Sequence, residues 1–271
     1  MKKTMTNQTE TNLDIRLARN ADDLEAAQRL RYRVFFDGMG AVPDPEVAAA
    51  KRDFDRFDDY CDHLLVIDKT KEAAGEECVV GTYRLLRRSV AQRHEGFYSA
   101  DEFDLSRLEN YQGEIVELGR SCVDPDYRGK AVMQLLWRGI AEYITDYKIS
   151  LMFGCASFPG TDTKAMASAL SYLHHHHSAP DEWSPKALDS RYVDLKLLKK
   201  KQIDSRQALR EMPPLIKGYL RVGGVIGKGG VIDHQFNTVD VCLLVETDNV
   251  TGRYQRHYLQ DAASMSNQAN T

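Results

Sequence analysis

The stretch Gly113–Tyr147, GEIVELGRSCVDPDYRGKAVMQLLWRGIAEYITDY, decides the fold. Its first part is rich in β-branched and apolar residues, which predicts a strand that runs to Val123. Asp124-Pro125-Asp126 then predicts a turn. Beyond Gly129 the apolar residues recur at helical spacing, which predicts a helix with an apolar face made of Val132, Leu135, Leu136, Ile140, Tyr143 and Ile144.

A strand, a short turn and a helix N-terminus together suit an anion, because free backbone N–H groups and the helix dipole attract negative charge. Arg128 and Lys130 add positive charge to this turn, and Gly129 lets a ligand approach the backbone closely. The pattern by itself fits an ordinary strand–turn–helix with a solvated arginine equally well.

The composition is that of a globular protein, with 42% hydrophobic and 28% charged residues. The net charge of −4 gives no reason to expect a nucleic-acid partner. The five cysteines are scattered and form no Cys-x-x-Cys pair, which indicates reduced thiols in a cytoplasmic protein. No apolar run reaches the roughly 18 residues of a membrane span, and a peripheral contact with the inner membrane stays open. We expect one domain over residues 13–260, with flexible tails at 1–12 and 261–271.

Strands and helices alternate along the rest of the chain. The predicted strands are Leu13–Arg19, His63–Asp68, Cys78–Leu86, Leu151–Phe158, Tyr192–Leu198 and Val239–Glu246. The predicted helices are Ala21–Phe36, with Asn20 as its N-cap, Thr161–His177 and Lys199–Glu211. The Gly-rich stretch Gly223–Asp233 lacks the context of a nucleotide-binding loop. This order predicts a mixed α/β fold.

The turn Tyr127-Arg128-Gly129-Lys130-Ala131 resembles the pyrophosphate-binding motif of the GNAT acyltransferase superfamily, Gln/Arg-x-x-Gly-x-Gly/Ala. It is a degenerate version, since the second glycine is absent. The order of elements also matches that superfamily. The resemblance implies a GNAT-like, mostly antiparallel central sheet with helices on both faces, and it assigns Tyr127, Arg128, Gly129, Lys130 and Ala131 to the pantetheine phosphate.

Further motifs resemble two families within that superfamily. Those of the first half resemble acyl-homoserine-lactone synthases, with Asp53 where that family usually has Glu: Leu30-Arg31-x-x-Val34-Phe35, Asp53-x-Asp55-x-x-Asp58, Gly81-x-x-Arg84-Leu85-Leu86 and Glu117-Leu118-x-Arg120. Those of the second half are longer and resemble the ornithine N-alpha-acyltransferases of ornithine-lipid synthesis: Ala169–His177, Pro214–Arg221 and Asp233-x-x-Phe236-Asn237-Thr238-x-Asp240-Val241.

The second resemblance implies an enzyme that moves a 3-hydroxy fatty acyl group from acyl-carrier protein to the α-amine of ornithine, giving lyso-ornithine lipid. The phosphopantetheine arm of the carrier would then be the donor, with no further cofactor and no metal. Two alternatives stay open. One is a synthase of another acyl amino acid or of an acyl-homoserine-lactone signal, and the other is a non-catalytic GNAT-like module that binds a lipid or a partner.

Transfer to an amine requires a base for the ammonium proton and a donor for the oxyanion. Glu117, on the central strand, is the candidate base, and burial among apolar residues is expected to raise its pKa. The alternative role is a structural partner of an arginine. Strict alternation separates Glu117 from Arg120, but a β-bulge at Gly119 would bring Arg120 to the same side and free an N–H group for the carbonyl oxygen.

An amino acid with two amines and a carboxylate suits a site of mixed charge, because arginine binds carboxylates bidentately and aspartate binds ammonium groups. The predicted members of this site are Arg31, Asp53, Asp55, Asp58, Arg84 and Arg120. A salt-bridge network that clamps a loop explains any single member equally well.

Two further features are less specific. His174–His177 are consecutive on a helix and cannot all bind one metal ion, so cations at a helix C-terminus are the simpler interpretation. Residues 196–221 hold eight cations and two anions. They form either a solvated face or a surface for an acidic carrier protein or an anionic membrane.

Overall fold

The computed structural model describes residues 12–248, which form two compact units. The first unit comprises the chain up to Leu86 together with Leu118–Glu142, and the second comprises Arg87–Glu117 together with the chain from Tyr143 onward. The two predicted tails, apart from Asn12, lie outside the described residues.

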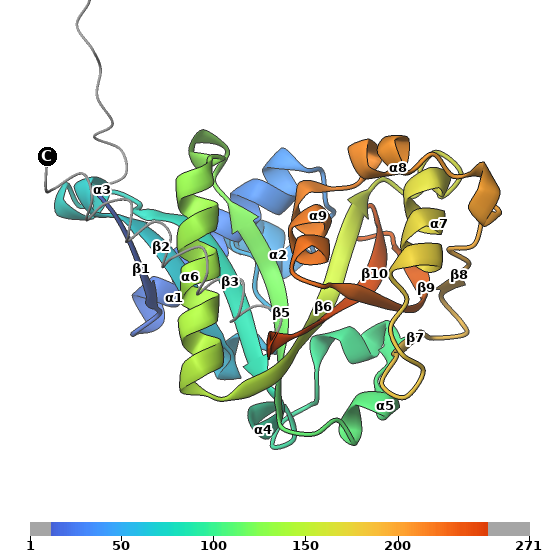
Figure 1. Cartoon of the computed structure of the whole chain (residues 1–271). Coiled ribbons are helices and arrows are strands. Elements are labelled where there is room, and N and C mark those ends of the chain that lie inside the picture. The colour runs from blue at the N-terminus through green and yellow to red at the C-terminus, as the bar shows by residue number, and fades with distance from the viewer. Residues whose placement is uncertain (1–11, 249–271) are drawn as a thin grey trace, which may run out of the picture. The chain divides into compact units, whose positions relative to one another are not determined.

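Each unit combines strands with helices, and the mixed α/β class is confirmed (Figure 1). The elements of the first unit are β1 (Leu13–Leu17), α1 (Ala21–Tyr32), the π-helical turn η1 (Arg33–Gly38), α2 (Pro45–Ala50), η2 (Asp58–Tyr60), β2 (Asp62–Asp68), α3 (Lys69–Ala73), β3 (Val79–Arg87), the end of β5 (Glu114–Val123), η4 (Pro125–Tyr127) and most of α6 (Lys130–Asp146).

The second unit begins at Arg87, the last residue of β3, and contains the first four residues of β5. Its other elements are α4 (Arg88–Ala91), η3 (Tyr98–Asp101), β4 (Phe103–Asp104), α5 (Ser106–Glu109), β6 (Ile149–Pro159), α7 (Ala167–His176), β7 (Lys186–Ala187), β8 (Tyr192–Val193), η5 (Lys200–Gln202), α8 (Ser205–Glu211), α9 (Pro214–Arg221), β9 (Val225–Asp233) and β10 (Thr238–Glu246).

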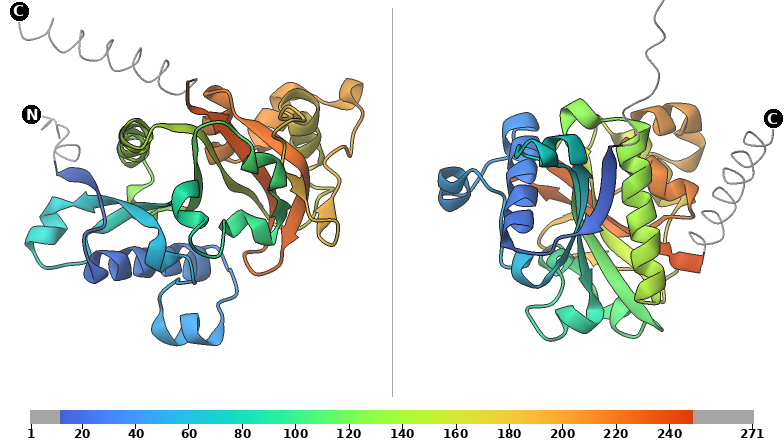
Figure 2. Two further views of the ribbon diagram at one scale, coloured as in Figure 1. Left: turned by 90° about the horizontal axis from the view of Figure 1, so that it is seen from below. Right: turned by 90° about the vertical axis from the view of Figure 1, so that its left-hand side faces the viewer.

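The sheet of the first unit lies between two helices (Figure 2). β1 pairs antiparallel with β2, which pairs antiparallel with β3, and β3 neighbours β5. Because side chains alternate along a strand, adjacent residues of β2 serve opposite faces. Leu65 belongs to the core cluster of α1, whereas Leu64 lies where a side chain at Gly139 of α6 would collide with it. Helices therefore cover both faces of this sheet, as predicted.

Helix α1 begins as its sequence predicts, since the Asn20 side chain accepts a hydrogen bond from the Asp23 amide at 2.9 Å. The α-helix ends at Tyr32 rather than at Phe36, and a π-helical turn follows. Tyr32 and Phe36 contact each other at a ring-centroid distance of 5.1 Å within this wider turn. Such turns are frequent at functional sites.

The sheet of the second unit is mostly antiparallel. β6 pairs in parallel with the first part of β5 and antiparallel with all nine residues of β10, and β10 pairs antiparallel with β9. Buried side chains of these strands, such as Phe153 and Leu244, form a core with Phe103 and Leu108. Apolar burial of this extent is the main favourable contribution to the stability of the unit.

Three sequence predictions in the second unit are corrected. The Gly-rich stretch, for which the sequence predicts no strand, contains the strand β9, and a glycine is needed at position 227 because a side chain there would lie 2.6 Å from the Pro185 carbonyl oxygen. The strand predicted at Tyr192–Leu198 is confined to Tyr192–Val193. The helix predicted at Lys199–Glu211 is divided into η5 and α8, because Asp204 caps α8 with its side chain.

All five cysteines of the chain are free thiols. In the described part of the chain, no helix combines the length and the apolar character needed to cross a membrane.

Candidate functional site

Three arginines and three aspartates of the first unit form one buried network of ion pairs. They come from α1, the segment that precedes β2, β3 and β5, and they are the six residues that the sequence assigns to a polar site: Arg31, Asp53, Asp55, Asp58, Arg84 and Arg120. The structure brings these distant positions together, and their role in binding an amino acid stays a prediction.

Arg31 is the centre of the network and is fully buried. Its guanidinium binds the Asp58 carboxylate with two parallel hydrogen bonds, of 2.6 and 3.1 Å. It also lies 2.9 Å from the Asp53 carboxylate and donates to the Asp53 carbonyl oxygen. The planar guanidinium suits this bidentate geometry, which a lysine could not reproduce.

The other two arginines share the same carboxylates. Arg84 binds Asp55 at 2.6 Å and Asp58 at 3.1 Å, and Arg120 binds Asp53 at 3.0 Å and Asp55 at 3.2 Å. Each carboxylate therefore contacts two arginines.

Arg120 and Asp55 form the partly exposed rim of the network, with side-chain exposures of 12% and 22%. The backbone at Arg120 is left-handed, with φ of 49°. The irregularity that the sequence placed at Gly119 thus lies on Arg120 itself. A non-glycine residue in this conformation costs about 1–2 kcal/mol, so its contacts with Asp53 and Asp55 hold a strained backbone in place.

The network changes the ionisation of its members. Burial alone would raise the pKa of Asp58, but Arg31 and Arg84 outweigh it and hold that pKa well below its usual value. The pKa of Asp55 is likewise lowered, because Arg84 and Arg120 outweigh its burial. His63, whose Nε2 lies 3.0 Å from the Asp58 carbonyl oxygen, has a pKa lowered by burial and by Arg31 and Arg84.

These contacts also fix a segment without regular structure. Asp53 and Asp55 lie between α2 and η2, and the Asp53 amide donates to the Gln28 carbonyl oxygen at 3.0 Å. The network can therefore clamp this segment against α1. With three positive and three negative charges, it is electrically balanced before any substrate arrives.

The turn that leads into α6 uses some of its own backbone donors, since the Gly129 amide donates to the Tyr127 carbonyl oxygen at 2.7 Å. That this turn binds an anion stays a prediction. The Asp124 side chain caps η4, and α6 begins at Lys130. A side chain added at Gly129 would meet no atom within 4 Å, so the space beside it is open. The Tyr127 side chain is engaged elsewhere, since its hydroxyl donates a hydrogen bond to Asp68 at 2.7 Å. Burial and this hydrogen bond raise the pKa of Tyr127.

Glu117 is buried in the second unit and holds the segment that contains η3. Its two carboxylate oxygens accept hydrogen bonds from the backbone amides of Tyr98 at 2.8 Å and Ser99 at 2.6 Å. Two N–H donors stabilise the ionised form of a carboxylate. The sequence could not show this contact, because nothing in residues 87–110 marks the partner.

An apolar cavity of about 570 Å³ lies in the same unit. This volume falls in the range of small-molecule sites, which are mostly apolar. The cavity is lined mainly by Ala91, Phe97, Ala100, Phe103, Leu105, Leu108, Ile115 and Leu188, with Arg88 among the polar lining residues. Phe97 and Ala100 immediately flank Tyr98 and Ser99, whose amides bind Glu117. Sequence reasoning missed this cavity because residues 87–110 show only weak periodicity.

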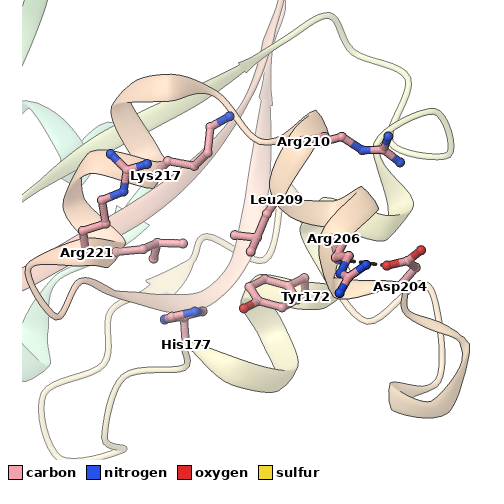
Figure 3. A pocket seen from close by; sticks show the side chains of 9 residues that line it. Tyr172, His177, Asp204, Arg206, Leu209, Arg210, Lys217 and Arg221 are labelled. Atoms are coloured by element: carbon pink, nitrogen blue, oxygen red, sulfur yellow. Dashed lines mark hydrogen bonds between the residues drawn. The ribbon is translucent and has the colours of Figure 1, made fainter. Parts of the chain in front are cut away.

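A cationic groove forms a second hollow, of about 870 Å³, between α7, α8 and α9. Figure 3 shows Leu209 and Tyr172 between the cations of α8 and those of α9. Its cations are Arg206, Arg210, Lys217 and Arg221, and none of the four forms an ion pair within residues 12–248. The excess positive charge predicted for residues 196–221 is therefore gathered partly around one concave surface.

The four histidines have separate surroundings. His175 Nε2 lies 3.0 Å from the Leu198 carbonyl oxygen, and His176 stacks on Tyr172. The rings of His174 and His175 are nearly perpendicular. Burial lowers the pKa of His174, His176 and His177, so this helix end does not favour protonated imidazoles.

Several known proteins are similar to this chain in sequence or in structure. A family model described as an acetyltransferase (GNAT) domain matches residues 30–138. The L-ornithine N(alpha)-acyltransferase of Agrobacterium fabrum is 48% identical over 248 residues, which are 91% of this chain and 85% of that protein. The protein of the same name from Rhodobacter capsulatus is 43% identical over 245 residues, covering 90% and 94%. A solved CoA-dependent acyl-homoserine lactone synthase is 15% identical, with a TM-score of 0.49 and coverage of 90% and 89%.

Proposed function

Because the chain belongs to the family of the L-ornithine N(alpha)-acyltransferases, we propose that it moves a 3-hydroxy fatty acyl group from acyl-carrier protein to the α-amine of ornithine, giving lyso-ornithine lipid. The chain is an acyltransferase. The identity of its donor, acceptor and product is the proposal.

One observation of the second unit carries the proposal. The apolar cavity suits an acyl chain, and the residues that flank its wall positions Phe97 and Ala100 donate their amides to Glu117. The segment Phe97–Ala100 therefore contacts both a buried carboxylate on β5 and an apolar cavity. Acyl transfer to an amine uses a base and a place for the acyl chain.

In the proposed reaction the neutral amine nitrogen attacks the thioester carbonyl carbon, and a C–N bond forms. The C–S bond then breaks, and the thiolate of the pantetheine arm leaves. Glu117 takes the proton that the attacking nitrogen loses, and this proton ends on the departing thiolate. The products are an amide and a free thiol, so atoms and charges balance without a further cofactor.

Glu117→Gln tests the base. We expect kcat to fall about 10²–10⁴-fold and the acidic limb of its pH profile to flatten. Glu114→Gln is the matched control, because Glu114 lies on the same strand and also accepts backbone amides, from Ser89 and Ile115. If Glu117→Gln kept the wild-type kcat, Glu117 would be an anchor of η3 and not the base.

We place ornithine at the rim of the first unit's network. Asp55 and Arg120 are the network members with the most exposed side chains, and they offer a carboxylate to an ammonium and a guanidinium to a carboxylate. Arg120→Lys should raise KM for ornithine more than it lowers kcat. An unchanged KM would remove Arg120 from the acceptor site.

For the donor we assign the phosphate of the pantetheine arm to the turn Arg128–Ala131, where the space beside Gly129 is open. We further assign the cationic groove to the acidic surface of the carrier protein. A hollow suits a protruding acidic helix better than a flat bilayer, and four cations without ion pairs are available to it.

The carrier assignment has its own test. Arg210→Glu with Arg221→Glu should raise KM for acyl-carrier protein at least tenfold and leave the reaction with a small acyl-pantetheine thioester unchanged. Lys164→Glu, an exposed cation outside the groove, should change neither value. If the double variant lost binding to anionic vesicles but kept the wild-type KM for the carrier protein, the groove would be assigned to a membrane surface instead.

The decisive experiment on function is mass spectrometry of the products. The purified chain, incubated with 3-hydroxyacyl carrier protein and a mixture of amino acids, should form N-acylornithine in excess over other acyl amino acids. A different acylated amino acid or a lactone would identify another acceptor, and the absence of any product would favour a non-catalytic module.

A further inference from the structure

Three buried carboxylates of the second unit meet in one place. Glu102, Asp233 and Asp240 can each direct an oxygen to a point where all three oxygens lie within 4.8 Å of one another. Glu102 follows η3, Asp233 ends β9 and Asp240 lies in β10. The residues are 3%, 7% and 5% exposed. Asp233 and Asp240 belong to a motif that the proposed function does not use.

The cluster carries more negative charge than its surroundings balance. Arg191 is its cation, with Nη2 at 3.4 Å from Glu102 Oε1. Three ionised carboxylates and one guanidinium leave a net charge of −2. Buried charges of this kind require a counter-charge.

Hydrogen bonds from neighbouring groups satisfy some of the carboxylate oxygens of the cluster. Asp233 accepts the backbone amides of Gln235 and Phe236 at 2.8 and 3.1 Å. The Cys155 thiol donates to Glu102 at 3.3 Å. Ser157 and Thr238 hydrogen-bond the Asp240 carboxylate, whereas Asp240 Oδ1 itself is buried without a partner of full hydrogen-bond geometry in the described part of the chain. A buried oxygen left without a donor is rare and costly.

We infer that Glu102, Asp233 and Asp240 bind a divalent metal ion of the oxygen-preferring class, Mg²⁺, Mn²⁺ or Ca²⁺. Such an ion brings two positive charges to a site with a net charge of −2. Oxygens on one ion, at about 2.1–2.4 Å from it, lie at most about 4.8 Å apart, and the three carboxylate oxygens all lie within this limit of one another. The ion also supplies the partner that Asp240 Oδ1 lacks.

The ion would hold three elements together rather than take part in catalysis. β9 and β10 are neighbours in the sheet, and Glu102 brings the segment after η3 to them. Arg191 is far more exposed than the three carboxylates, since its side chain is 35% exposed.

A proton is the competing occupant. Burial and the neighbouring Asp240 raise the pKa of Glu102 to about 7, and burial raises the pKa of Asp240 to about 6, in the absence of an ion. Protonated carboxylates would lower the charge of the cluster without any metal. The experiment must therefore detect the ion itself.

Electron paramagnetic resonance with Mn²⁺ makes this distinction, because bound Mn²⁺ loses the sharp six-line signal of the free ion. The full chain, treated with EDTA and dialysed, should bind one Mn²⁺ per chain, and Mg²⁺ or Ca²⁺ should displace it. Asp240→Asn should weaken binding at least tenfold. Asp189→Asn, which changes an exposed aspartate of the same unit, should bind as the wild type does.

Thermal unfolding gives an independent readout. Mn²⁺ should raise the Tm of the wild type by several degrees and leave that of Asp240→Asn unchanged. If Asp240→Asn does not fold, Glu102→Gln takes its place. No Mn²⁺ binding by the wild type up to millimolar concentration would overturn the proposal. Binding that survives Asp240→Asn would assign the ion to another site, such as the histidine run, and would overturn it as well.

Discussion

Two buried clusters of charged side chains in this chain differ in how their positive and negative charges balance. The network of the first unit joins three aspartates with Arg31, Arg84 and Arg120. The carboxylate cluster of the second unit joins Glu102, Asp233 and Asp240 with one arginine.

This difference in charge balance shows two ways in which a protein can stabilise buried charges. In a balanced network each desolvated group has its partners within the protein, and loss of one partner leaves an uncompensated charge. In the unbalanced cluster the protein supplies too few partners, so an external cation or bound protons must complete it. The same substitution should therefore have opposite effects in the two places.

The largest effect is expected in the balanced network. Arg31→Met removes the fully buried guanidinium and leaves Asp58 and Asp53 short of a partner. We expect the free energy of unfolding to fall by about 3–5 kcal/mol, measured by urea denaturation at pH 7. In the double variant with Asp58→Leu the loss should be smaller than the sum of the two single losses. A loss below about 1 kcal/mol for Arg31→Met would show that the network does not hold the fold.

A matched pair of isosteric changes compares the two clusters directly. Asp58→Asn should lower the free energy of unfolding by about 2–3 kcal/mol, because it weakens charged hydrogen bonds to Arg31 and Arg84. Asp240→Asn should raise it by on the order of 1 kcal/mol in metal-free protein, because ionised Asp240 is disfavoured there. Urea denaturation of both variants in EDTA at pH 7 measures whether each change raises or lowers the free energy of unfolding. If both changes destabilise, the balance of charge is not what distinguishes the clusters.

The dependence of stability on pH should reveal the balanced network in two windows. The pKa of His63 is lowered by burial, so below about pH 6.5 the unfolded chain takes up a proton that folded His63 does not, and stability falls. Because the pKa values of Asp55 and Asp58 are lowered, both carboxylates contribute to the free energy of unfolding above about pH 4. This contribution is lost as the pH falls below that value. His63→Gln should abolish the part of the stability loss below about pH 6.5 that His63 causes. The loss below about pH 4 should remain. Identical curves for His63→Gln and wild type would exclude His63.

Local patterns predicted several of the regular elements. Apolar periodicity in 113–147 gave the strand and the helix α6, and the cap at Asn20 gave the start of α1. The resemblance to known families marked the six charged residues. Neither the local patterns nor the resemblance shows whether these six residues bind each other or a substrate, because the distances between their side chains depend on tertiary packing.

The unbalanced cluster could not be predicted, because Glu102 lies outside any regular element and meets the strands β9 and β10 only through tertiary packing. Asp240 does leave one signal, since it interrupts the apolar run Val239–Val245. Glu102 leaves none, because it lies in a stretch without periodicity. Strand β9 was missed since glycine is rare in strands, and only the close approach of Pro185 explains why Gly227 is required there.

The smallest effect tests whether burial is what makes charge matter. Glu25, on α1 like Arg31, pairs with Arg29 at 3.5 Å and Arg52 at 2.7 Å, but its side chain is 47% exposed. Water screens such pairs, so Glu25→Gln should change the free energy of unfolding by less than about 1 kcal/mol. The change should vanish in about 1 M salt, whereas the loss caused by Arg31→Met should persist, since salt does not reach a buried pair. Urea denaturation at low and high salt measures both. An effect of Glu25→Gln as large as that of Arg31→Met would mean that the number of ion pairs on α1, and not their burial, determines stability.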